Sequence, residues 1–167
     1  KQEEVDGIMG LLTKGLLKIH EDAKKEKTRV VHIGRRDRIH KKLLELIENI
    51  EEETKMYEGF CLCIAIDYGG EDEIERAEIR RRESKKIYNN ESNERSILNF
   101  LDTTIAKVPA PDLIIRTGGE TRTSGFMPLQ SAYAEWIFET VLFPDFSVDV
   151  FQKAIDEYRS RCRRFGA

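Results

Sequence analysis

The segment from Arg116 to Gly125 reads Arg-Thr-Gly-Gly-Glu-Thr-Arg-Thr-Ser-Gly and collects residue types that bind oxygen-rich anions. Arg116 ends a short apolar run, and Arg122 and Ser124 follow the two glycines. Guanidinium groups, hydroxyl groups and accessible backbone amides are the donors that a diphosphate needs. A Gly-Gly turn flanked by surface arginines fits the same residues, because neither a Walker lysine nor the Rossmann glycine spacing is present. Both interpretations stand on the residues alone.

Glu135 is the second residue whose setting suggests chemistry, because it lies between Ala134 and Trp136 at the edge of an apolar segment. A carboxylate in such a place needs a cationic partner or a metal ion. A metal ligand, a salt-bridged glutamate and a capping glutamate all fit this position.

The cysteines and histidines form no recognisable metal-binding pattern. Cys61, Cys63 and Cys162 contain no Cys-x-x-Cys pair, and their odd number favours neither a disulfide framework nor a zinc site. We expect buried, reduced thiols, with Cys61 and Cys63 on the same face of a strand. The three histidines are spread along the chain without ligand spacing.

Short apolar runs that alternate with helical repeats must position these residues. Strands are predicted at residues 29–33, 60–66, 112–116 and 136–138. Helices are predicted over residues 5–19, 39–50 and 97–101, after Gly70 as far as Asn89, and from the N-cap Ser147 onward. This order indicates one α/β domain over residues 1–167, with a mostly parallel central sheet flanked by helices. Arg116 then ends a strand at the edge where such sheets bind ligands.

Two segments carry a further expectation about burial. Residues 60–66 are almost entirely apolar, which predicts a strand covered on both faces. The helix after Gly70 interleaves six basic residues with glutamates, which is typical of a solvated face.

The composition narrows the class of protein. The 167 residues carry 28 basic and 31 acidic side chains, a net charge of −3, which argues against a nucleic-acid binder. No apolar run approaches the ~20 residues that span a bilayer, and the first residues do not resemble a signal peptide. We expect a cytoplasmic protein whose membrane association, if any, is peripheral.

The stretch from Pro111 to Phe146 resembles the C-terminal signature of the cis-prenyltransferases, the undecaprenyl diphosphate synthase family. The matching segments are Asp-Leu-Ile-Ile-Arg-Thr-Gly-Gly-Glu at 112–120, Ser-Ala-Tyr-Ala-Glu at 131–135 and Phe-Pro-Asp-Phe at 143–146. Arg-Arg-Phe-Gly at 163–166 is similar to the family's terminal Arg-x-Gly element, and Ile-Ala-Ile-Asp-Tyr-Gly-Gly at 64–70 to its strand ending in Tyr-Gly-Gly. The opening helix also fits, so the resemblance covers the whole chain.

The resemblance implies the condensation of isopentenyl diphosphate with an allylic prenyl diphosphate, which builds a cis-polyprenyl diphosphate, the precursor of a lipid carrier. Arg116, Arg122 and Ser124 would hold isopentenyl diphosphate, with the backbone of Thr123 between them. Glu135 would help to hold Mg²⁺. The resemblance further implies a homodimer in which Arg164 and Gly166 reach into the neighbouring subunit's site.

Two family motifs do not occur in these 167 residues: the Asp-Gly-Asn-Gly-Arg-Trp loop, whose aspartate binds Mg²⁺ in the family, and a Ser-x-Glu-Asn-Trp-like segment. We therefore expect that the N-terminal third of the family domain, with a first strand and its phosphate loop, is missing, and that this chain alone is inactive. The alternatives are a non-catalytic subunit of a heterodimeric cis-prenyltransferase and an unrelated phosphate-binding module. The retained Arg116, Arg122, Ser124 and Glu135 argue against the first alternative.

Overall fold

A computed structural model describes residues 2–88 and 96–161 of the chain. The chain divides into two compact units, unit 1 (Lys1–Val108) and unit 2 (Pro109–Ala167). Unit 1 contains α1 (Gln2–Glu26), β1 (Arg29–Ile33), α2 (Lys41–Thr54), β2 (Cys61–Ala65), α3 (Gly70–Tyr88), the 3-10 turn η1 (Ile97–Phe100) and α4 (Asp102–Ile105). Unit 2 contains β3 (Leu113–Arg116), β4 (Glu135–Phe138), the 3-10 turn η2 (Phe143–Asp145) and α5 (Val148–Ser160).

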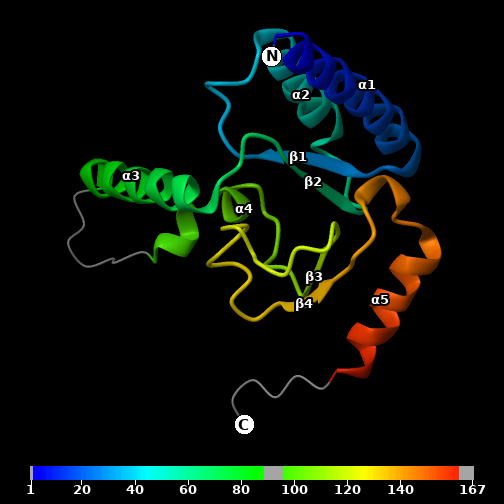
Figure 1. Cartoon of the computed structure of the whole chain (residues 1–167). Helices are drawn as coiled ribbons and strands as arrows, with labels where there is room; N and C mark the ends of the chain where they lie inside the picture. Colours follow the sequence, from blue (N-terminus) through cyan, green and yellow to red (C-terminus); the bar gives the residue numbers. More distant parts are fainter. Residues whose placement is uncertain (1, 89–95, 162–167) are drawn as a thin grey trace. The chain divides into compact units, whose positions relative to one another are not determined.

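In unit 1 a pair of parallel strands carries two helices on one face. β1 pairs with β2 in a register that runs from Arg29 beside Cys61 to Ile33 beside Ala65. Helices α1 and α2 lie side by side above these strands (Figure 1). The buried core between them consists of Leu16, Ala23, Val30, Leu43, Ile47 and Ile50. The apolar spacing predicted for residues 39–50 thus forms the inner face of α2.

The expectation that residues 60–66 form a strand covered on both faces was wrong. Four residues of β1 are buried, whereas Cys61, Leu62 and Ala65 of β2 are exposed, Leu62 at 40%. The segment around α4 contacts β1, where the Arg29 guanidinium donates to the carbonyl oxygen of Ala106 at 2.9 Å.

The cysteines follow the exposure of β2. Cys61 is exposed and Cys63 half-buried, and both are free, so the expectation of a buried thiol was wrong for Cys61. Burial raises the pKa of the Cys63 thiol to about 11. Cys162 lies outside the described residues.

Unit 2 is built on a second pair of parallel strands, β3 and β4, with Leu113 beside Glu135 and Arg116 beside Phe138. The Ser147 hydroxyl caps α5 as predicted by accepting from the Val150 amide at 3.4 Å.

Both strand pairs are parallel, α2 lies between β1 and β2, and helices follow β2 and β4, which confirms the predicted α/β class. The helix predicted over residues 97–101 is divided, because Leu101 is extended between η1 and α4. The predicted helix break at Asn89 lies outside the described residues. That residues 1–167 form one domain stays a prediction. No helix in the described part of the chain has both the length and the apolar character to cross a membrane.

Candidate functional site

Arg116 is the last residue of β3 and the centre of the predicted anion site in unit 2. Its Nη1 donates to the carbonyl oxygen of Arg122 and to Ser124 Oγ, the latter at 3.2 Å. The segment after β3 therefore folds back over the end of its own strand. It brings the Arg116 guanidinium, the Arg122 backbone and the Ser124 hydroxyl together, whereas the sequence predicted that the Arg122 side chain would act as a donor.

The glycine amides do not play the predicted part. The Gly118 amide donates to the carbonyl oxygen of Val141 at 2.7 Å, and the Gly119 amide donates to that of Glu139 at 2.9 Å. These bonds continue the pairing of the two segments beyond β3 and β4. The expectation that these amides face a ligand was wrong, and the donors at this edge are side chains.

A cavity of about 330 Å³ opens at the same edge. Its lining residues are Ile114, Ile115, Arg116, Thr117, Thr123, Ser124, Phe126 and Trp136. Ser124 has a φ of 48°, in the left-handed region that residues other than glycine rarely adopt. The Phe126 amide closes the turn by donating to the Thr123 carbonyl oxygen at 3.0 Å. A strained residue held in this way is typical of a segment that must present a side chain at a fixed place.

The Arg122 backbone contacts Arg116, but the Arg122 side chain has another partner. Its guanidinium forms an ion pair with Glu120, and the two side chains are 68% and 47% exposed. Because exposed ion pairs contribute little free energy, an incoming diphosphate can replace Glu120 as the partner of Arg122.

Glu135 begins β4 and lies beside Leu113, at the opposite end of the strand pair from Arg116. Leu113 and Arg116 are three residues apart along β3, so Glu135 lies about 10 Å along the strand direction from Arg116. Glu135 Oε2 lies 2.9 Å from Arg161 Nη1. The carboxylates of Glu135 and Glu157 raise the pKa of Arg161 above its ordinary value. Of the alternatives left open by the sequence, the salt-bridged glutamate is the one present.

Two predicted site residues, Arg164 and Gly166, lie outside the described residues. Within residues 2–88 and 96–161, no three or more His, Cys, Asp or Glu side chains are grouped so that they could hold a metal ion. Mg²⁺ takes one or two carboxylates together with substrate phosphate oxygens and waters. Glu135 therefore fits as a single ligand, and only in competition with Arg161.

The sequence interpretation missed the apolar walls of the cavity. Phe126 and Trp136 line it together with the two isoleucines of β3. The Trp136 ring stacks on Phe138 with a centroid distance of 5.7 Å. Phe126 lies next to the arginine segment in the sequence, which could have suggested that it lines the site. The alternation of residues along a strand does not say which face borders a cavity.

Comparisons with known proteins agree on one family. The family model of the undecaprenyl diphosphate synthases matches residues 1–166. An isoprenyl transferase of Aquifex pyrophilus is 40% identical over 163 residues, which cover 98% of this chain and 68% of that protein. The crystal structure of a probable undecaprenyl diphosphate synthase from Campylobacter jejuni has a TM-score of 0.85 at 36% identity and covers 100% of this chain and 76% of that one. Lavandulyl diphosphate synthase from Lavandula x intermedia, crystallised with dimethylallyl diphosphate, has a TM-score of 0.92 at 28% identity and covers 100% and 73%.

A parallel α/β fold with an arginine and a hydroxyl group beside a cavity at the end of a strand is the general arrangement of α/β proteins that bind anionic ligands. Within that class, the chain belongs to the undecaprenyl diphosphate synthase family, the cis-prenyltransferases. The chain spans 68% of the length of the Aquifex relative.

Proposed function

We propose that unit 2 binds isopentenyl diphosphate for prenyl transfer onto an allylic diphosphate. The observation that carries the proposal is the Arg116 guanidinium held against Ser124 Oγ at the mouth of the unit 2 cavity. Arg116 supplies charged donors to the diphosphate, and the Ser124 hydroxyl and the Thr123 backbone add neutral donors. Arg122 joins them on leaving Glu120. Phe126 and the neighbouring apolar lining contact the isopentenyl group and exclude water.

In the proposed reaction the C–O bond between the allylic group and its diphosphate breaks. A C–C bond forms to the terminal carbon of isopentenyl diphosphate, and the loss of one proton leaves a cis double bond. The products are the longer cis-polyprenyl diphosphate, free diphosphate and that proton. The residues of unit 2 contribute by fixing the acceptor, because positioning and charge neutralisation supply much of the rate in such reactions.

We propose Mg²⁺ as the accompanying ion, with Glu135 as a single protein ligand. The ion would neutralise diphosphate charge. Arg161 must release the Glu135 carboxylate for this to happen, so the Arg161 guanidinium competes with the ion for that carboxylate.

The 167-residue chain is proposed to bind isopentenyl diphosphate without turning it over, since the Asp-Gly-Asn-Gly-Arg-Trp motif does not occur in it. The complete enzyme is proposed to be a homodimer, with the non-catalytic subunit of a heterodimer as the alternative.

The test is the transfer of labelled isopentenyl diphosphate onto an allylic diphosphate with Mg²⁺, followed by extraction of the lipid product. The chain, verified by mass, is assayed beside the full reading frame that contains it. We expect long products from the full frame alone. Turnover by the verified chain would contradict the proposed inactivity, and no product from either protein would favour the partner-subunit alternative.

A further inference from the structure

Unit 1 contains a second polar cavity that the proposed reaction does not use. It has a volume of about 530 Å³, within the range of small-ligand sites. We define it as the β1 cavity, because it opens where β1 ends, at the edge at which α/β sheets bind ligands. It is lined by Val31, His32, Gly34, Arg35, Arg36, Asp37, Glu51, Arg76, Arg80, Asp102, Ile105 and Ala106.

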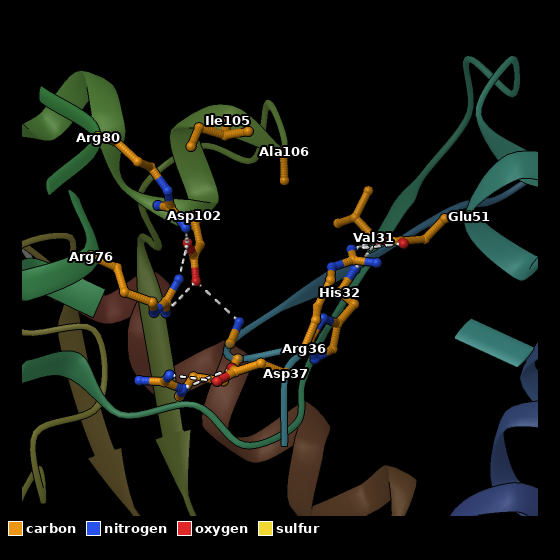
Figure 2. Close-up of a pocket in the computed structure, with 12 residues that line it drawn as sticks. Val31, His32, Arg36, Asp37, Glu51, Arg76, Arg80, Asp102, Ile105 and Ala106 are labelled. Atoms are coloured by element: carbon orange, nitrogen blue, oxygen red, sulfur yellow. Dashed lines mark hydrogen bonds and ion pairs between the residues drawn. The ribbon is translucent and has the colours of Figure 1, made fainter. Parts of the chain in front are cut away.

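Asp102 forms one wall of the β1 cavity. Figure 2 shows Arg76 and Arg80 converging on its carboxylate. Arg76 makes two bonds of 2.7 Å to it, Arg80 Nη2 lies 2.8 Å from Oδ1, and the Gly34 amide donates to Oδ2 at 3.1 Å. Both carboxylate oxygens of Asp102 therefore already have two partners each.

Glu51 forms a second such wall together with Arg36. The Nη2 of Arg36 donates to both oxygens of Glu51, at 2.9 and 2.8 Å, and the His32 amide donates to Oε1 at 2.8 Å. The carboxylates of the two walls are thus occupied by protein donors, so a cationic ligand finds no strong acceptor there.

The side-chain groups of the β1 cavity that remain without a partner among the described residues include hydrogen-bond donors of Arg36 and Arg80. Within the described part of the chain, the Arg36 guanidinium donates only through Nη2, to Glu51. The Arg80 guanidinium donates through Nη1 to the Phe100 carbonyl oxygen and pairs through Nη2 with Asp102. This leaves Nε and Nη1 of Arg36 and Nε of Arg80 without an acceptor among the described residues. The two side chains are 40% and 33% exposed, so these donors are accessible to a ligand.

The other two arginines act as supports. All three nitrogens of the Arg35 guanidinium donate to Asp37 or Asp72, and those of Arg76 donate to Asp72 or Asp102. These pairs use three of the five N–H donors of each guanidinium group and fix the rim of the cavity.

His32 is a buried part of the same wall. It is 7% exposed, and its Nε2 lies 3.0 Å from the Ile66 carbonyl oxygen, which can only accept, so Nε2 carries the proton. Its Nδ1 is buried and has no partner in the described part of the chain.

We infer that the β1 cavity binds a phosphate-type oxyanion through Arg36 and Arg80. Planar guanidinium groups match phosphate oxygens, and the charges of the cavity are otherwise balanced by its carboxylates. All of these residues belong to unit 1, so the inference does not depend on the proposed function of unit 2.

The inference is tested by following the Nε–H signals of arginine side chains in a ¹⁵N-labelled chain carrying Arg116→Ala, which weakens the unit 2 site. Inorganic phosphate, inorganic diphosphate and isopentenyl diphosphate are added separately at low salt, so that a free ion and a substrate headgroup are distinguished. We expect saturable shifts of two signals, identified by their loss in Arg36→Lys and Arg80→Lys.

Each lysine variant keeps the positive charge that pairs with the neighbouring carboxylate but loses the planar set of guanidinium donors. We expect each to weaken binding of the phosphate-type ligand about tenfold or more. Arg82→Lys is the matched control, because Arg82 lies on the same helix as Arg80, is 73% exposed and does not line the cavity. Far-UV circular dichroism verifies that each variant is folded. The absence of saturable shifts, or an equal loss in the Arg82 control, would overturn the inference.

Discussion

Replacement of Asp102 by alanine should strongly destabilise unit 1, although Asp102 belongs to a short helix of four residues. The carboxylate is 8% exposed, and it is the shared partner of Arg76 and Arg80, whose side chains are 17% and 33% exposed. Removing one partner of a buried ion pair costs about 3–5 kcal/mol, because the remaining charge is left unpaired. Since water can reach part of both guanidinium groups, and Arg76 keeps Asp72, we expect the lower end, about 3 kcal/mol.

Asp37→Ala is the matched control at the same cavity. Asp37 also pairs with an arginine, Arg35, but it is 62% exposed and Arg35 keeps Asp72 as a second partner. An exposed pair of this kind contributes little to the free energy of unfolding, so Asp37→Ala should have a much smaller effect than Asp102→Ala. Asp102→Asn keeps the shape and one carbonyl acceptor but loses the charge, so it should fall between the two, at about 2 kcal/mol.

The assay is urea unfolding at neutral pH followed by far-UV circular dichroism, which reports on unit 1 because its helices are the longest described. Burial opposes ionisation of Asp102, but the hydrogen bonds from Arg76 and Arg80 outweigh it, and its pKa lies below the ordinary value. Its contribution to stability is therefore complete above about pH 4, the unfolded pKa, and is lost as the pH falls through the folded pKa. Equal destabilisation by Asp37→Ala and Asp102→Ala would refute the reasoning.

The remaining predictions concern other parts of unit 1 and the strand edge of unit 2. Gly34→Ala should destabilise by more than about 2 kcal/mol, because Gly34 has a φ of +115° and an added Cβ would lie 2.3 Å from a carbonyl oxygen. Gly118→Ala, at a φ of +90° with open space, should cost only about 1 kcal/mol in the same urea experiment. Burial lowers the pKa of His32, so stability should fall as the pH drops below 6.5 towards the folded pKa, and His32→Gln should abolish that dependence in pH-dependent melting curves. Cys61 should react with a thiol reagent at pH 8 well before Cys63, whose pKa is about 11, and equal rates in a background without the third cysteine would contradict this order.

Local signals in the sequence predicted the elements well. The spacing of Leu43, Ile47 and Ile50 identified the inner face of α2, and Ser147 was correctly identified as an N-cap. The sequence also placed Arg116 and Ser124 in one candidate segment after a strand, and the structure brings these two side chains into contact. These features depend on residues close together in the chain.

Features that depend on distant residues were missed. Arg76 and Arg80 were interpreted as part of a solvated face because glutamates are interleaved with them, yet both bind Asp102, which lies in a later helix. The Gly118 amide was expected to face a ligand, but its acceptor is the carbonyl oxygen of Val141, beyond β4. Periodicity and propensity do not specify such tertiary partners.

The central claim is that unit 2 holds isopentenyl diphosphate through Arg116 and Ser124. Its most direct test is calorimetric titration of isopentenyl diphosphate into the chain, into Arg116→Ala and Ser124→Ala, and into Arg82→Ala as a control on unit 1. We predict saturable binding, weakened about tenfold or more by Arg116→Ala, less by Ser124→Ala, and unchanged by Arg82→Ala. Binding that is no tighter than that of inorganic phosphate, or that survives the loss of the Arg116 guanidinium unchanged, would contradict the claim.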